Sequence, residues 1–152
     1  MNIRLSGQLC NVGIGQAFQC GDGVKNKTLY SRRIAGQYTF PFMIAHAPGP
    51  ALFVQPTIEM AKRLSKQRLD SLIHETPCLA EKIAPARSRD SGNTMFSKEF
   101  PGGILLLTGA NSATGLRSAP CRWVLLDEVD AFPSDVDGEG DPCALAERRA
   151  WI

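Results

Sequence analysis

Short apolar runs alternate with polar segments from Phe42 onward, and their spacing predicts a series of strands and helices. Ala51-Leu52-Phe53-Val54 follows a Pro-Gly-Pro break and predicts a buried strand. Thr57 can cap a helix from Ile58 to about Ile73, with a rough apolar face and a polar face that carries basic residues. A shorter helix is expected over Pro77–Ile83.

Two further apolar runs, Thr94–Phe100 and Gly103–Thr108, are joined by Pro101-Gly102. Proline and glycine fit the two central positions of a type II turn, because glycine readily adopts the positive φ needed at the second of them. These residues therefore predict a β-hairpin. The loop from Gly109 to Pro120 is expected to hold about one helical turn.

The apolar run from Arg122 to Leu126 ends in two adjacent acids, Asp127 and Glu128. Such a run predicts a strand that is buried on both faces. Carboxylates at its end are costly to desolvate unless a cation meets them. In nucleotide-hydrolysing α/β proteins this cation is Mg²⁺, which the first acid holds while the second orients or deprotonates the attacking water. A strand followed by a solvated acidic turn is the alternative interpretation.

The last part of the chain predicts an acidic, glycine-rich loop and a helix. Asp141 is expected as the N-cap, Pro142 as the first helical residue, and Cys143–Trp151 as the helix. Because no cap signal follows, we expect a truncated protein. The alternation of strand, helix, hairpin and strand predicts an α/β domain with a largely parallel but incomplete sheet. Such sheets bind ligands beyond the carboxyl ends of their strands, where Asp127 and Glu128 are placed.

Composition narrows the class of protein but does not give the function. The 152 residues suit one domain, and 43% hydrophobic with 21% charged residues is typical of a folded globular protein. A net charge of +2 is too small to indicate a nucleic-acid partner by itself. No apolar run is long enough to cross a membrane, and the start lacks a secretory signal. Five scattered cysteines without a Cys-x-x-Cys pair argue against a disulfide framework or a zinc site, so a cytoplasmic location is expected.

Several short motifs follow one another in order from about Phe42 to Arg149. Through them the chain resembles the ATPase domain of phage terminase large subunits of the lambda GpA type. The resemblance implies a P-loop NTPase-like fold with flanking helices, ATP and Mg²⁺ as ligands, Asp127 as the Mg²⁺-binding acid and Glu128 as the catalytic glutamate. The motifs are His46-Ala47-Pro48-Gly49-Pro50, Val54-Gln55-Pro56-Thr57, Arg87–Thr94, Phe100-Pro101-Gly102-Gly103, Gly109-Ala110-Asn111-Ser112, Leu125–Asp130 and Gly138–Pro142.

The resemblance also implies partners. Proteins of this type are motors that pull double-stranded phage DNA into a procapsid, act with a small terminase subunit and dock on the portal in the host cytoplasm. Their endonuclease half has no counterpart in this chain. Lys62, Arg63 and Lys66 on the basic helix face are candidate contacts to DNA phosphates. An ordinary solvated helix surface is the alternative.

The phosphate-binding loop of such ATPases is the main departure. Gly21–Thr28 comes within one residue of G-x-x-x-x-G-K-[ST], with Asn26 where glycine is expected. Lys27 and Thr28 would then be the nucleotide-binding residues, although no strand signal precedes Gly21. Residues 1–41 are therefore expected to be an atypical segment that is not native to the fold, and residues 42–152 a partial motor domain.

Two other functions stay open on the sequence. One is a non-catalytic prophage remnant that has no working phosphate-binding loop and keeps only binding surfaces. The other is a fragment of a helicase-like nucleic-acid motor, because apolar strands that end in Asp-Glu occur there too. Mg²⁺-dependent binding of ATP would separate the packaging motor from the remnant.

Overall fold

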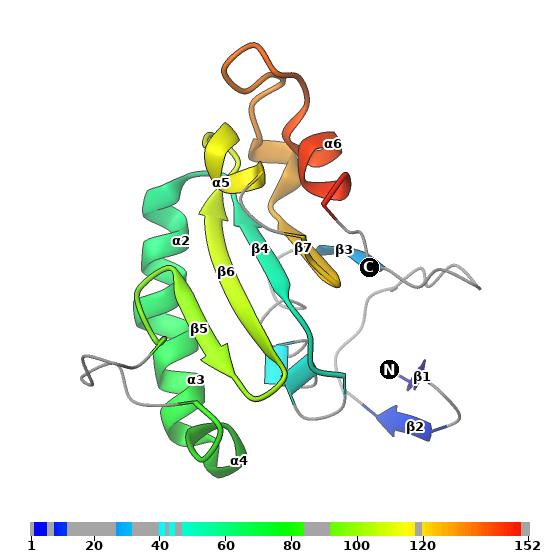
Figure 1. The fold of residues 1–152 in the computed structure, drawn as a ribbon, viewed down its shortest axis with the longest axis vertical. Helices are drawn as coiled ribbons and strands as arrows, with labels where there is room; N and C mark the ends of the chain where they lie inside the picture. The colour runs from blue at the N-terminus through cyan, green and yellow to red at the C-terminus, as the bar shows by residue number, and fades with distance from the viewer. Residues whose placement is uncertain are drawn as a thin grey trace.

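A five-stranded sheet forms the centre of the molecule (Figure 1). The computed structural model describes residues 2–5, 8–11, 27–31, 40–41, 43–44, 47–83, 92–117 and 120–149. The strand order is β3-β7-β4-β6-β5. These strands are β3 (Lys27–Ser31), β4 (Ala51–Gln55), β5 (Ser97–Phe100), β6 (Gly103–Gly109) and β7 (Trp123–Asp127). A separate antiparallel pair consists of β1 (Asn2–Leu5) and β2 (Gln8–Asn11).

The central sheet is largely parallel, which confirms the predicted α/β class. β7 pairs in parallel with β3 and with β4, and β4 pairs in parallel with β6. β5 runs antiparallel to β6, as the predicted hairpin requires, and Gly102 has the expected positive φ of +87°. β5 is shorter than predicted because the Thr94 amide donates to the Ser97 carbonyl at 2.7 Å and closes a local turn before the strand.

Successive residues of β4 and β7 face two different hydrophobic cores, because side chains alternate along a strand. This two-sided burial explains why both strands are continuous apolar runs in the sequence. The first core receives Ala51, Phe53, Trp123 and Leu125, and the second receives Leu52, Val54, Val124 and Leu126.

One long helical segment covers the first core (Figure 1). Thr57 caps it as predicted, since its hydroxyl accepts a hydrogen bond from the Met60 amide at 3.3 Å. A π-helical stretch interrupts the segment and places both Ser65 and Leu69 at 0% exposure, a feature that the sequence did not predict. The elements are α2 (Ile58–Leu64), η1 (Ser65–Leu69), α3 (Asp70–Glu75) and α4 (Pro77–Ala80).

Two shorter helices, α5 (Ala113–Arg117) and α6 (Pro142–Glu147), cover the second core. Asp141 caps α6 as predicted, because its carboxylate accepts a hydrogen bond from the Ala144 amide at 2.9 Å. This helix ends at Glu147, before the predicted end at Trp151. The Arg149 carbonyl accepts a hydrogen bond from the Cys121 amide at 2.8 Å, which ties the end of the helix to the entry of β7.

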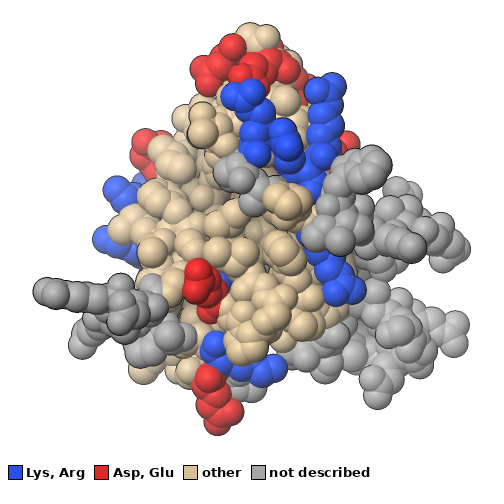
Figure 2. Space-filling view, in the orientation of Figure 1, with Lys and Arg blue, Asp and Glu red and all other residues tan. Residues whose placement is uncertain are grey.

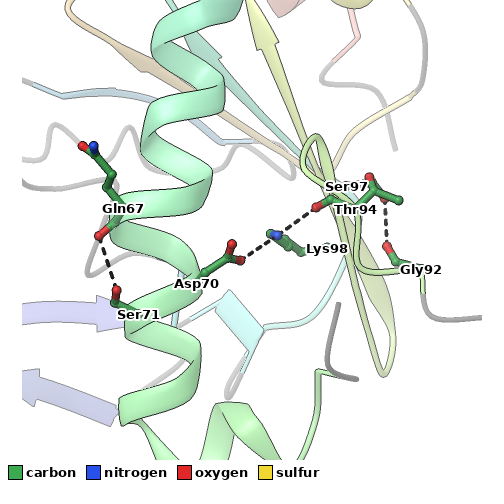
Figure 3. Close-up of polar contacts among 7 residues, drawn as sticks. All are labelled: Gln67, Asp70, Ser71, Gly92, Thr94, Ser97 and Lys98. Atoms are coloured by element: carbon green, nitrogen blue, oxygen red, sulfur yellow. Dashed lines mark hydrogen bonds and ion pairs between the residues drawn. The ribbon is translucent and has the colours of Figure 1, made fainter. Parts of the chain in front are cut away.

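An ion pair between a buried lysine and a half-buried aspartate links strand β5 to the long helical segment (Figure 3). The Lys98 side chain is 1% exposed, and its ammonium group donates to Asp70 Oδ1 at 2.8 Å and to the Thr94 carbonyl at 2.8 Å. The Asp70 side chain is 42% exposed and meets the lysine at the rim of the core. Paired in this way, a lysine can be buried without leaving an uncompensated charge.

The amino ends of the strands are joined by a cluster that we call the proline clamp: Pro48, Gly49, Pro50, Gly103 and Arg122. The Arg122 guanidinium donates to the Pro48 carbonyl at 3.0 Å, and the Arg122 amide donates to the Pro50 carbonyl at 2.8 Å. A Cβ atom at Gly103 would lie 2.4 Å from the Gly49 carbonyl oxygen, so this contact requires glycine. The motifs that contain Pro48-Gly49-Pro50 and Gly103 therefore have a packing role, at the end of the strands opposite Asp127 and Glu128.

Parts of the segment 1–41 contact the rest of the chain. β3 pairs with β7, and Phe40 is 1% exposed with its ring edge-on to Phe100 at 6.3 Å between centroids. The boundary at residue 41 stays a prediction. Within the described ranges, no helix is long and apolar enough to cross a membrane.

Candidate functional site

Three parallel strands end side by side on the edge of the sheet opposite the proline clamp. Asp127 ends β7, Gln55 ends β4, and Gly109 ends β6. Because Phe53 and Leu125 face the first core, the alternation directs Gln55 and Asp127 to that same face, which α2 covers. We call Gln55, Gly109, Asp127 and Glu128 the carboxylate edge.

A buried hydrogen bond joins the two polar residues of this edge. Gln55 Nε2 donates to Asp127 Oδ2 at 3.0 Å, and the two residues are 4% and 8% exposed. The sequence pattern indicated no role for Gln55. A polar residue that ends an apolar run was a usable signal, but its partner depends on which strands are neighbours, and the strand order could not be read from the sequence.

Glu128 follows the strand in an unusual backbone conformation. Its φ of 54° and ψ of 43° are left-handed, which is strained for a residue with a Cβ atom. The Glu128 carbonyl accepts a hydrogen bond from the Ala131 amide at 2.9 Å, and a short 3₁₀ helix, η2 (Val129–Ala131), begins there. This reversal takes the Glu128 side chain out of the alternation of the strand, and it is half-buried beside buried Asp127.

Gly109 brings the end of β6 against the first turn of α2. A Cβ atom at Gly109 would lie 2.4 Å from Asn111 Oδ1 and 2.4 Å from the Ile58 amide nitrogen. No side chain fits between strand and helix at this point. The first residue of the Gly109–Ser112 motif must therefore be glycine for β6 to pack against α2, at the same end of the sheet as Asp127 and Glu128.

The carboxylate edge suits Mg²⁺ that arrives with a phosphate ligand. Mg²⁺ prefers oxygen ligands and is usually held by one or two carboxylates, with waters and substrate phosphates completing the shell. Among the described residues, no group of three or more His, Cys, Asp or Glu could hold a metal ion. Asp127 supplies one buried carboxylate, which suits a Mg²⁺ ion whose remaining ligands are waters and substrate phosphates. A structural zinc site would need four protein ligands.

Lys27 and Thr28, the predicted nucleotide-binding residues, lie in strand β3. In the parallel register they are opposite Trp123 and Val124, while Ser31 is opposite Asp127. Three to four residues of strand, on the order of 10 Å, therefore separate their backbone from the carboxylate edge. The backbone of these two residues thus lies away from the acids, and residues 21–26 lie outside the described ranges.

The predicted DNA contacts lie on the long helical segment. Lys62 and Arg63 are in the last turn of α2, Lys66 is in the π-helical stretch, and all three are exposed. Figure 2 shows basic side chains along the margin of the molecule where Figure 1 places α2. Arg68 is exposed on the same π-helical stretch and extends this surface, which we call the basic helix face.

The acidic loop between β7 and α6 is held by its own contacts. The Asp135 carboxylate accepts hydrogen bonds from the Gly138 and Gly140 amides, both at 2.8 Å. Arg117 of α5 forms an ion pair with Glu139 at 2.9 Å, with 45% and 31% of the two side chains exposed. Acidic side chains gather over this loop, with basic ones directly below them (Figure 2). The Gly138–Pro142 motif is accordingly a structured connection.

The cysteine before β7 is a buried thiol. Burial raises the pKa of the Cys121 thiol to about 11, and its side chain is 0% exposed. Burial and the nearby Asp141 and Glu147 raise the pKa of Cys143 as well. The raised pKa values favour the protonated thiol over the thiolate at both positions.

One known protein family matches most of the chain. The family described as phage terminase large subunit gpA, ATPase domain, matches residues 31–151. The chain belongs to this family. The matched region contains four of the five strands in full, every helix whose bounds are given above, and the carboxylate edge.

Two curated terminase large subunits are similar to part of the chain. That of Enterobacteria phage P21 is 30% identical over 112 residues, which cover 71% of this chain and 17% of the relative. That of Escherichia phage lambda is 26% identical over 121 residues, which cover 79% of this chain and 19% of the relative. The chain thus spans less than a fifth of the length of these relatives. No solved structure matches it significantly.

Proposed function

We propose that this terminase ATPase domain binds Mg²⁺-ATP at the carboxylate edge and hydrolyses it to drive DNA packaging. The observation that carries the proposal is the position of Asp127, buried at the carboxyl end of a central parallel strand and followed directly by Glu128. In open α/β sheets, ligands bind beyond this end of the strands. Membership of an ATPase-domain family supports the nucleotide.

The two acids would have different roles. Asp127 would hold Mg²⁺, which when bound lowers the charge repulsion around the γ-phosphate. Glu128 would orient a water molecule and accept its proton while the water oxygen bonds to the γ-phosphorus and the bond to the β–γ bridging oxygen breaks. The left-handed turn at Glu128 supports this division, because it takes Glu128 out of the alternation that would direct its side chain to the face opposite Asp127.

Replacing Asp127 with asparagine tests the proposal. We expect Mg²⁺-dependent ATP binding to weaken by about tenfold or more, because a charged contact is worth about 1.5–3 kcal/mol. Binding is measured by calorimetry or with a fluorescent ATP analogue, with and without Mg²⁺. The control Asp137→Asn removes an exposed acid of the loop and should leave binding unchanged. An unchanged Asp127→Asn variant would contradict the assignment of the metal ligand.

A non-catalytic remnant is the second candidate function, and the placement of Lys27 and Thr28 favours it. A phosphate-binding loop needs its lysine next to the phosphates that Mg²⁺ also contacts, whereas these residues lie toward the other end of β3. A remnant would show no saturable ATP binding even at millimolar ATP. The same binding experiment on the unmodified chain therefore decides between the two functions.

Packaging also requires contact with double-stranded phage DNA, which we assign to the basic helix face. Replacing Lys62 and Lys66 with alanine should weaken binding to a DNA duplex severalfold. The slope of log affinity against log salt concentration should become shallower by about one for each DNA phosphate that no longer meets a lysine. Fluorescence anisotropy at several salt concentrations measures both quantities.

A lysine elsewhere on the surface provides the control for this test. Lys82 is exposed after α4, and Lys82→Ala removes a positive charge away from the basic helix face. Because the test variant removes two charges and the control removes one, an equal loss of log affinity per removed charge would show a response to net charge alone and would reject the assigned face. The small terminase subunit and the portal are the remaining partners that we propose, and the host cytoplasm is the proposed location.

A further inference from the structure

We propose that Gln55 is a positioning residue for the carboxylate of Asp127, an inference that rests on the function proposed above. The backbone of Gln55 is fixed by the sheet, since its carbonyl accepts a hydrogen bond from the Ala110 amide at 2.7 Å. β4 lies between β7 and β6, and the Gln55 side chain is buried. The amide that reaches Asp127 is therefore held by the central strands and not by a loop.

The contact is of a kind that orients a carboxylate without neutralising it. A carboxylate rotates easily about its last torsion, because such sp³–sp² torsions have broad minima. The Gln55 amide donor, 3.0 Å from Oδ2, restricts this rotation. An amide donor carries no charge, so it does not compete with a cation as lysine or arginine would. Partners of this type around metal ligands set both their orientation and the affinity for the metal.

The surrounding residues indicate that the polar pair is more than packing. The preceding residues on the same face of the two strands are Phe53 and Leu125, which belong to the first core. Along β4 and β7 themselves, the side chains on this face are apolar until the last residue of each strand, Gln55 and Asp127, next to Glu128. Burial of an amide and a carboxylate costs free energy that two apolar side chains would avoid. The geometry therefore favours a role for the pair at the carboxylate edge.

The test separates metal binding from stability in the 152-residue chain. Gln55→Met keeps the approximate length of the side chain and removes the donor. The Mg²⁺ concentration for half-maximal ATP binding should rise about tenfold or more, whereas the affinity for ATP without metal should change less than about twofold. Gln67→Met, at an exposed glutamine of the π-helical stretch, is the matched control and should change neither quantity.

Each outcome bears on a different proposal. If the unmodified chain shows no Mg²⁺-dependent ATP binding, the proposed function and this inference both fail. If the unmodified chain binds, Asp127→Asn weakens binding and Gln55→Met does not change the Mg²⁺ requirement, only the inference fails. A lower melting temperature with an unchanged Mg²⁺ requirement shows a purely structural residue and also overturns it.

A second variant covers the case in which Gln55→Met does not fold. Gln55→Asn keeps a buried amide but withdraws it from Asp127 by one methylene group, so the hydrogen bond of 3.0 Å is lost. The same increase in the Mg²⁺ requirement is expected, with circular dichroism to confirm the fold. An unchanged requirement in a folded Gln55→Asn variant overturns the inference as well.

Discussion

Replacing Glu128 with glutamine should slow ATP hydrolysis by a factor on the order of 10²–10⁴ while leaving ATP affinity within about twofold. Glutamine has nearly the same shape but cannot accept a proton from water. The nucleotide and its cation would be held by other groups, so binding should persist. Single-turnover hydrolysis and equilibrium binding on the same preparation measure the two quantities separately.

A second substitution at Glu128 separates strain from chemistry. Its left-handed backbone, with φ of 54°, is a conformation that glycine adopts without the Cβ penalty. Glu128→Gly should therefore lose hydrolysis as completely as Glu128→Gln. Its free energy of unfolding should equal that of the parent or exceed it by up to about 1 kcal/mol. Chemical denaturation gives the free energy of unfolding.

The control for both changes is Glu75→Gln, at an acid of α3 far along the helical segment from its first turn. It should alter neither hydrolysis nor stability. Hydrolysis by Glu128→Gln at the rate of the parent would reject Glu128 as the general base. A Glu128→Gly variant that is clearly less stable than the parent would show that side-chain contacts of Glu128 outweigh its backbone strain.

Replacing Asp70 with alanine should destabilise the fold by about 3 kcal/mol, because it leaves the buried ammonium group of Lys98 without its carboxylate. The Thr94 carbonyl would remain as an acceptor 2.8 Å away, but it carries no charge. The loss corresponds to a change of roughly two orders of magnitude in the folding equilibrium. Urea unfolding followed by fluorescence or circular dichroism measures it.

Removing the charge as well should restore most of this stability. In Asp70→Ala combined with Lys98→Met, an apolar side chain fills the space of the lysine and no buried charge is left, so the pair of changes should be close to neutral. Ser71→Ala next to Asp70 removes only a weak, exposed hydrogen bond of 3.4 Å and serves as the control. A small effect of Asp70→Ala alone, or no recovery in the double variant, would contradict the importance of this ion pair.

Much of the fold could be predicted from the sequence because local signals were strong. Thr57 and Asp141 were recognisable as helix caps, and Pro101-Gly102 as a turn, since each depends on neighbouring residues alone. The apolar runs of β4 and β7 were long enough to indicate strands buried on both faces. These signals together were sufficient for the α/β class and a largely parallel sheet.

Other features depend on contacts between distant segments and could not be predicted. The strand order decides that Gln55 meets Asp127, 72 positions later in the chain. The π-helical stretch buries Leu69 in the first core, which includes residues from distant strands. Pairing of β3 with β7 determines where Lys27 and Thr28 lie, whereas the sequence pattern placed them in a loop.

The candidate site was predicted only in part for the same reason. The place of Asp127 at the end of β7 follows from the apolar run itself. The left-handed backbone of Glu128 has no local signal, since neither glycine nor asparagine occupies the position. Roles for Asp127, Glu128 and the basic helix face stay predictions until nucleotide and DNA binding are measured.

The proline clamp and the carboxylate edge lie at opposite ends of the same strands, separated by five residues of β4, on the order of 16 Å. Because the proline clamp contributes packing, substitutions in it would give heat-sensitive alleles. Their protein would function at low temperature and be degraded at high temperature. Lesions at the other end would give alleles that are null at every temperature although the polypeptide accumulates normally. Genetics could thus map the architecture of this domain without any assay of its chemistry.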